Sequence, residues 1–194
     1  MGGLGAVIAR GLDYREVFQV FRSGFDLGAE RERRAAAGQP ESFGGEDLYA
    51  DARPCLAALR AEGLRVGLAG NQTARAETIL RALDLPVDVI GMSDGWGVEK
   101  PSAEFFERVV TEAGYPAREV LYVGDRLDND IRPAQAVGLV TAPIRRGPWG
   151  HILEDPAVEN RCLFHLYSLT ELPDVRSSKS PGPPRKQKQM IYET

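Results

Sequence analysis

Apolar positions along the chain follow two different patterns. Between residues 14 and 37 they recur at helical spacing, and the glycines and proline of residues 38–45 then break the pattern. From about Asp51 onwards, short apolar runs typical of buried strands alternate with amphipathic stretches typical of helices. The expected strands are 65–69, 87–90, 120–123 and 140–142, and the expected helices are 54–63, 73–83, 102–113 and 133–137.

Strands that alternate with helices pair in parallel through right-handed crossovers. The sequence therefore predicts an α/β fold at residues 47–175, with a Rossmann-like parallel sheet and flanking helices, in which 163–165 is a last short strand. Residues 1–46 are expected to form a small helical cap region. Residues 176–194 are expected to be a disordered tail, because the stretch 177–188 has no apolar residue to bury.

Composition narrows the classes of function. The 194 residues fit one domain with a small insert, and a net charge of −4 argues against a nucleic-acid partner. No apolar run approaches the roughly 20 residues of a membrane span, so no membrane partner is expected. The first residues lack the basic region of a secretory signal, and Cys55 and Cys162 are too few for a disulfide framework. We expect a cytoplasmic protein, either a monomer or a homodimer.

A cluster of acidic side chains directly follows the strand expected at 120–123. It contains Asp125, Asp128, Asn129 and Asp130. Open parallel sheets hold their ligands at the carboxyl ends of their strands, and a divalent cation relieves the repulsion between clustered carboxylates. We therefore predict Mg²⁺ as the cofactor, with Asp125 and Asp130 as its ligands. Asp130 could instead only cap the following helix.

Two further loops after expected strands carry candidate phosphate-binding residues. Gly70 and Asn71 precede a helix, where backbone donors and a side-chain amide can approach an anion, although both residue types are also common in plain turns. Lys100, fixed by the proline that follows it, could neutralise a phosphate or could simply be solvated. Arg145 and Arg146 could contact an anionic substrate, but a solvated loop is the favoured interpretation for them.

Three segments together resemble the haloacid dehalogenase (HAD) superfamily of hydrolases: 68–71, 99–101 and 123–130. In that family an aspartate attacks the phosphorus to give an aspartyl-phosphate, and a second aspartate two residues later acts as acid and base. The resemblance implies that Asp125 and Asp130 hold magnesium and that Gly70, Asn71 and Lys100 bind the phosphate. It also implies a catalytic role for Lys100, which would stabilise the nucleophile and the transferring phosphoryl group.

The chain departs from the family pattern at two places. Gly70 stands where the family usually has Ser or Thr, and no Asp-x-Asp sequence occurs before residue 47. The family's first strand, which lies between the strands that here end at Ala69 and Val123, is therefore expected to be missing through an N-terminal truncation. The apolar segment 4–9 could fill that gap or could begin a cap helix.

The expected function is therefore a magnesium-dependent phosphatase of a small phosphorylated metabolite that turns over little in this form. Two alternatives remain. The chain could be a non-catalytic protein that binds phosphate and metal, or a metal-independent hydrolase of the 2-haloacid dehalogenase type.

Overall fold

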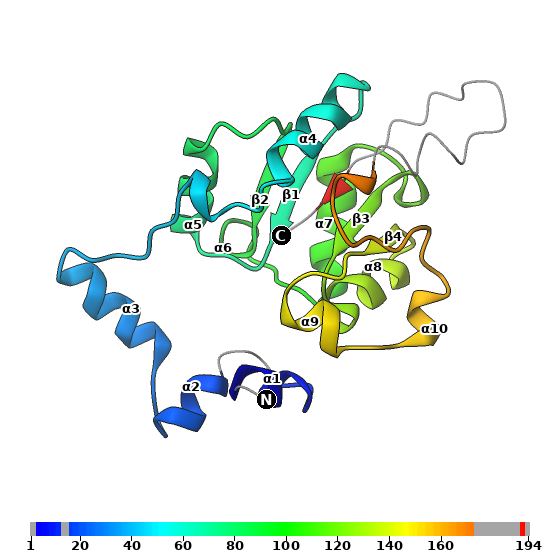
Figure 1. Cartoon of the computed structure of the whole chain (residues 1–194). Coiled ribbons are helices and arrows are strands. Elements are labelled where there is room, and N and C mark those ends of the chain that lie inside the picture. The colour runs from blue at the N-terminus through cyan, green and yellow to red at the C-terminus, as the bar shows by residue number, and fades with distance from the viewer. Residues whose placement is uncertain (1–2, 13–15, 173–190, 193–194) are drawn as a thin grey trace, which may run out of the picture.

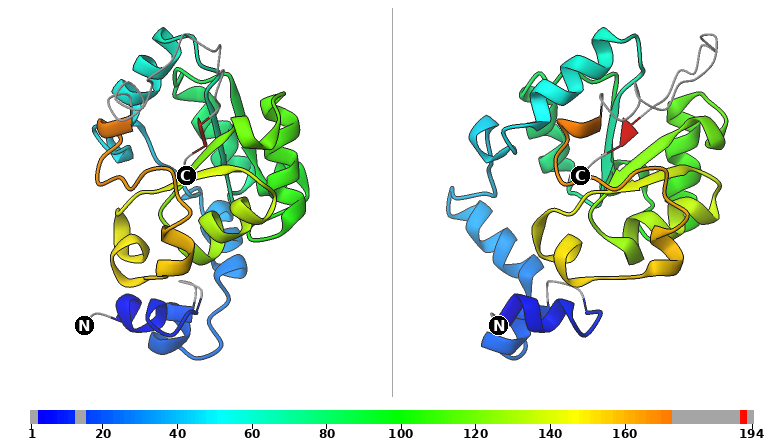
Figure 2. Two further views of the ribbon diagram at one scale, coloured as in Figure 1. Left: turned by 90° about the vertical axis from the view of Figure 1, so that its right-hand side faces the viewer. Right: turned by 45° about the vertical axis from the view of Figure 1, so that its right-hand side comes forward.

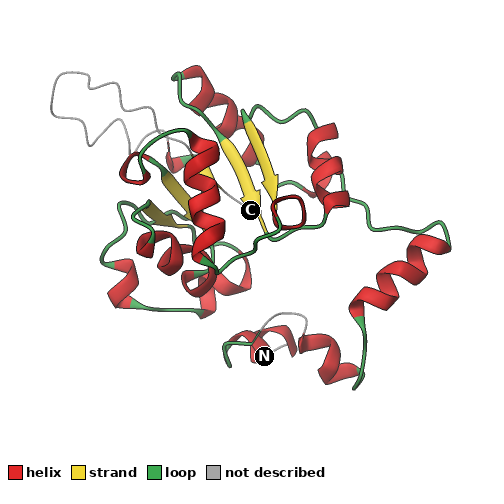
Figure 3. Ribbon diagram, turned by 180° about the vertical axis from the view of Figure 1, so that it is seen from behind, coloured by secondary structure: helices red, strands yellow, loops and turns green. Residues whose placement is uncertain are grey.

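The computed structural model describes residues 3–12, 16–172 and 191–192 and shows parallel strands surrounded by helices (Figures 1 and 3). β1 pairs in parallel with β2, and β3 pairs in parallel with both β4 and β5. The predicted α/β fold class is confirmed. The strands are β1 (Gly67–Gly70), β2 (Val89–Met92), β3 (Leu121–Gly124), β4 (Val140–Pro143) and β5 (Ile191–Tyr192).

The helices of the α/β part begin where the sequence supplies capping side chains. The Thr73 hydroxyl accepts from Ala76 N at 3.1 Å, and the Ser102 hydroxyl accepts from Phe105 N at 3.4 Å. The helices are α4 (Ala52–Ala61), α5 (Ala74–Ala82), α6 (Ser93–Trp96), α7 (Ala103–Ala113), α8 (Arg132–Ala136), α9 (Gly147–Ile152) and α10 (Pro156–Glu159). The shorter turns are η1 (Gly45–Asp47), η2 (Ala117–Glu119) and the π-helical η3 (Leu127–Ile131).

β3 is buried along its whole length and joins the two halves of the core. Leu121 and Val123 belong to one apolar cluster, whereas Tyr122 belongs to the other, as the alternation of side chains along a strand requires. Tyr122 meets the Phe106 ring edge-on, with 5.2 Å between ring centroids. Because β3 is packed on both faces, the position at which the acidic loop begins is fixed.

Among the described residues of the N-terminal region, the helices are α1 (Gly3–Ile8), α2 (Glu16–Phe21) and α3 (Leu27–Ala36). The described part of the helical pattern expected at 14–37 contains α2 and α3. Gly24 takes a positive φ of 73° between them, and Asp26 caps α3 through Ala29 N. Most of the apolar segment 4–9 belongs to α1, which packs against α9. The segment therefore does not fill the gap in the sheet. In Figure 2 these helices lie to one side of the α/β part.

Two expectations about the C-terminal part differ from the structure. The strand expected at 163–165 is absent from the described chain, where one parallel bridge joins Ile144 to Leu166 instead. Ile191 and Tyr192 form β5 inside the segment expected to be a disordered tail, because they find ladder partners on β3. Residues 173–190 and 193–194 lie outside the described chain. Among the described residues, no helix combines the length and the apolar character needed to cross a membrane.

Asp51 ties the start of α4 to two distant loops. Its Oδ2 accepts from the Ser168 hydroxyl at 2.7 Å and from Leu169 N at 3.0 Å, and it pairs with the Arg146 guanidinium. Burial alone would raise the pKa of Asp51, but the hydrogen bonds from Ser168 and Arg146 outweigh burial and lower it. The charged form of this carboxylate is therefore the one that stabilises the fold.

We predict that Asp51→Asn destabilises the protein by about 1–3 kcal/mol at neutral pH, since it removes the charge that Arg146 and Ser168 contact. A carboxylate whose pKa is lower in the folded chain stabilises it above the unfolded pKa and loses that effect as the pH falls through the folded value. The difference between the native protein and the variant should therefore shrink below the ordinary value of 3.8. Urea unfolding across a pH series measures the difference in the free energy of unfolding. A difference that does not change with pH would contradict a stabilising role of the Asp51 charge.

Candidate active site

Three loops that are far apart in the sequence meet at the carboxyl edge of the parallel strands. Asn71 follows β1, Lys100 lies between β2 and α7, and Asp125 follows β3. The Asn71 side chain donates from Nδ2 to Lys100 O at 2.9 Å and accepts from Lys100 N at 2.7 Å through Oδ1. This pair of hydrogen bonds closes one loop onto the other and fixes the backbone from which the Lys100 side chain extends.

Lys100 and Asp130 form a buried ion pair. Lys100 Nζ lies 2.8 Å from Asp130 Oδ1, and only 5% and 3% of the two side chains are exposed. Asp130 Oδ2 accepts from Arg126 N at 3.0 Å, so both carboxylate oxygens are engaged. A Cβ on Gly124 would stand 2.6 Å from the Asp130 Cβ, which explains why a glycine ends β3. Asp130 therefore holds the acidic loop together and does more than cap a helix.

Asp125 is the less neutralised carboxylate of the site. Burial and the nearby Asp130 raise its pKa to about 6, against the opposing effect of Lys100. In the described part of the chain, no three His, Cys, Asp or Glu side chains gather as a metal-binding group. Mg²⁺ is usually held by one or two carboxylates together with water and substrate phosphate, and Asp125 offers such a carboxylate. The donors at this edge therefore fit magnesium.

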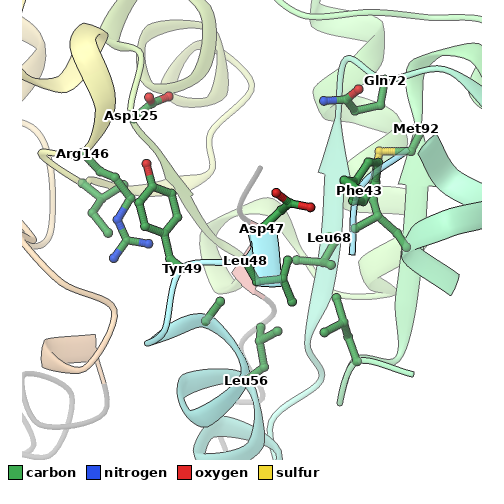
Figure 4. Close-up of a pocket in the computed structure, with 14 residues that line it drawn as sticks. Phe43, Asp47, Leu48, Tyr49, Leu56, Leu68, Gln72, Met92, Asp125 and Arg146 are labelled. Atoms are coloured by element: carbon green, nitrogen blue, oxygen red, sulfur yellow. The ribbon is translucent and has the colours of Figure 1, made fainter. Parts of the chain in front are cut away.

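A cavity of about 430 Å³ opens beside Asp125 (Figure 4). Its polar lining includes Asp125 and Arg146 on one side and Gln72 on the other, and most of the remaining wall is apolar. Asn71, Lys100 and Asp130 do not line it, so only one of the predicted metal and phosphate residues faces this space. Further lining residues are Phe43, Asp47, Leu48, Tyr49, Ala52, Leu56, Leu68, Leu80, Leu85, Met92 and Ile144.

The two arginines at 145 and 146 are not in a solvated loop, and that prediction is wrong. Arg145 pairs with Glu159 at 3.3 Å, and the Arg146 guanidinium lies 4.1 Å from the Tyr49 ring centroid. Only 12% of the Arg146 side chain is exposed, and α9 begins at the next residue. Sequence reasoning also missed Gln72 and Tyr49. Gln72 directly follows Asn71 and could have been considered, whereas nothing near Tyr49 in the sequence signalled its role.

A cation–π contact stands beside the acidic loop. Arg126 lies 5.3 Å from the Trp149 ring centroid, and its guanidinium also pairs with Asp128 at 2.8 Å. Burial would raise the pKa of Asp128, but its hydrogen bonds with Arg126 lower it. Asp128 is therefore already neutralised by its neighbour, which distinguishes it from Asp125.

The family profile described as haloacid dehalogenase-like hydrolase matches residues 13–138, well over half of the chain. The chain belongs to the haloacid dehalogenase-like hydrolases. The resemblance drawn from the three sequence segments is thereby confirmed.

Named relatives of this HAD-like chain include phosphatases. It is 33% identical over 123 residues to the glyceraldehyde 3-phosphate phosphatase of Methanocaldococcus jannaschii, covering 62% of this chain and 52% of the relative. It is 30% identical over 136 residues to the ribulose-1,5-bisphosphate 5-phosphatase of Halopiger xanaduensis, covering 67% of this chain and 57% of the relative. The chain thus spans about half the length of the curated relatives that it matches.

Solved structures share the fold of this HAD-like chain. The HAD-hydrolase YfnB from Bacillus subtilis, bound to magnesium, matches with a TM-score of 0.65 and 22% identity over 89% of this chain and 77% of the other. A HAD phosphatase from Thermococcus onnurineus matches with a TM-score of 0.57 and 20% identity over 89% of this chain and 86% of the other. These likenesses bear on architecture alone.

We predict strong energetic coupling between Lys100 and Asp130. Lys100→Met or Asp130→Asn alone should cost about 3–5 kcal/mol of stability, because each leaves its partner buried without compensation. The double variant should cost clearly less than the sum, by roughly 1–3 kcal/mol. Urea unfolding of the four proteins gives the coupling energy.

The exposed pair Glu30–Arg33 of α3 is the matched control for this cycle. Its side chains are 30% and 69% exposed at a distance of 2.6 Å, so the corresponding Glu30→Gln and Arg33→Met cycle should give a much smaller coupling energy, because solvent screens the pair. Equal coupling energies for the two pairs would show that burial does not strengthen the pair at the site.

Proposed function

We propose that this chain carries the phosphate-binding and magnesium-binding half of a HAD-like phosphatase that acts on small phosphorylated metabolites. The observation that supports this most directly is the arrangement of Lys100, Asp125 and Asp130 at one strand edge, beside a cavity large enough for a small ligand. Relatives named as phosphatases of glyceraldehyde 3-phosphate and ribulose bisphosphate support the substrate class.

The residues would divide the work by their surroundings. Asp125, which is incompletely neutralised and faces the cavity, would hold Mg²⁺ directly. Asp130, whose two oxygens bind Lys100 Nζ and Arg126 N, would set the position of the lysine and of the loop. Bound there, magnesium would supply charge neutralisation to the phosphoryl oxygens.

The phosphate group would be bound by donors of the first two loops. Asn71 uses Oδ1 and one Nδ2 hydrogen on the Lys100 backbone, and its amide has a second hydrogen to offer an anion. The backbone at Gly70, at the end of β1, and the ammonium of Lys100 would complete this set. Lys100 would also stabilise negative charge that develops on the transferring group, which is the catalytic role we assign to it.

We further propose that this sequence by itself turns over little substrate. Covalent phosphoryl transfer needs an attacking carboxylate, and the chain has no Asp-x-Asp segment before residue 47. In the described chain, the neighbour of β3 on the side towards β1 is β5, not a strand that ends in such a segment. A non-catalytic protein that binds phosphate and magnesium is therefore the second candidate, and it shares the same binding residues.

We predict that Asp125→Asn weakens Mg²⁺ binding at least about tenfold, which is the cost that even outer-shell partners of metals show. Isothermal titration of the purified chain with MgCl₂ measures the affinity. Asp128→Asn is the matched control, because Arg126 already pairs with that carboxylate in the same loop, and it should leave the affinity unchanged. Equal Mg²⁺ affinity of Asp125→Asn and the native chain would rule out Asp125 as a ligand.

Phosphate release distinguishes the two candidate functions. With glyceraldehyde 3-phosphate and MgCl₂, we expect the chain to release phosphate at a rate close to that of the uncatalysed control, since the attacking carboxylate is missing. Turnover well above that rate, abolished by Asp125→Asn, would show that the chain is a complete phosphatase and would contradict the proposed deficit. Failure of inorganic phosphate to bind, measured by calorimetry, would contradict both functions.

A further inference from the structure

The sheet has a gap in its middle. β1 and β2 form one ladder, and β4, β3 and β5 form another, with no ladder between β1 and β3 in the described chain. β5 lies in that gap, hydrogen-bonded to β3 and in contact with β1 (Figure 1). All three strands run in the same direction. β5, which comes from the far end of the sequence, therefore lies between two strands of the α/β part.

β5 fills only part of this gap. Ile191 pairs with Leu121 and Tyr192 pairs with Tyr122, whereas Val123 and Gly124 have no partner on that side among the described residues. The cavity described above is lined by Leu68 of β1 and by Asp125, the residue directly after β3. Residues of β1 and of the loop after β3 therefore border both the gap and the cavity.

We propose that the space between β1 and β3 is a strand-binding slot and that the segment Ile191–Tyr192 of the same chain is its occupant. β3 is buried along its whole length, and an unpaired backbone in such a place is costly. A parallel strand on its open side provides backbone partners for Leu121 and Tyr122, the first half of β3. β5 pairs with β3 and contacts β1, so it connects the two ladders. These are the strands that Asp125 and Asn71 directly follow.

The sequence of the segment suits this place. The stretch 177–189 has no apolar residue, and it is followed by Met190, Ile191 and Tyr192. Isoleucine and tyrosine favour strands, whereas the polar and proline-rich stretch before them does not. After residue 176, the apolar residues are therefore confined to 190–192, and this short run includes the two residues that pair with β3.

The tether makes a short strand sufficient. Eighteen residues, 173–190, separate Leu172 from β5 in the sequence. A chain of that length can span up to about 60 Å when fully extended. Because the segment is joined to the rest of the chain, its binding is intramolecular, and its effective concentration at the slot exceeds that of a free peptide. A free peptide of the same sequence would bind far more weakly.

Amide hydrogen exchange on the intact chain tests the proposal. We expect an amide of Ile191 or Tyr192 to exchange at least about tenfold more slowly than in the free peptide 189–194, since ladder hydrogen bonds protect it. Light scattering across a concentration series, run in parallel, should show that the chain is a monomer under the conditions in which these amides are protected. Exchange of both amides at the rate of the peptide would overturn the proposal. Protection confined to a dimer would also overturn it, because the occupant would then come from a second copy.

A pair of proline variants adds a second, independent readout. Ile191→Pro with Tyr192→Pro removes both donors of the segment and should speed exchange of the β3 amides that face β5 by roughly tenfold or more. Ser177→Pro with Ser178→Pro places the same two prolines outside β5 and should leave the β3 amides unaffected. Equal behaviour of the two variants would overturn the proposal. If the first variant does not fold, the measurement on the intact chain still decides.

Discussion

The buried pair between Lys100 and Asp130 is the interaction on which the rest of the site depends. It brings one lysine from the loop after β2 together with one carboxylate from the loop after β3, in a place where neither side chain reaches much water. Burying two charges is costly unless further hydrogen bonds satisfy them, and here Arg126 N supplies one to the carboxylate. The geometry of both loops is therefore set by the need to keep this pair intact.

Two features of the backbone follow from that pair. Gly124 ends β3 because a side chain there would occupy the space of Asp130. The chain then forms the π-helical turn η3, which places Asp130 back over the end of the strand. Asp125 has less of its charge neutralised by neighbouring cations than Asp130 has. Burial and the nearby charge of Asp130 raise its pKa. The loop therefore pairs with the lysine through Asp130 and lines the cavity through Asp125.

The sequence predicted those parts of the site whose signal is local. Asn71 and Asp125 each follow an apolar run, and parallel pairing brings the ends of such runs to one edge, so their convergence could be expected. The contact between Arg146 and Asp51 could not, because 95 residues separate them and each alone suits a solvated surface. Helical spacing of apolar residues predicted helix at 14–37 but did not mark where α2 ends and α3 begins, which the positive φ of Gly24 decides.

The contact between Arg126 and Trp149 places an intrinsic fluorescent side chain beside the acidic loop. The chain has two tryptophans, and the other one, Trp96, packs against Phe105 with 5.3 Å between ring centroids. Their emission therefore samples two separate environments, one next to the acidic loop and one inside the second apolar cluster. Quenching that affects the first and spares the second would distinguish an event at the candidate active site from a general loosening of the molecule.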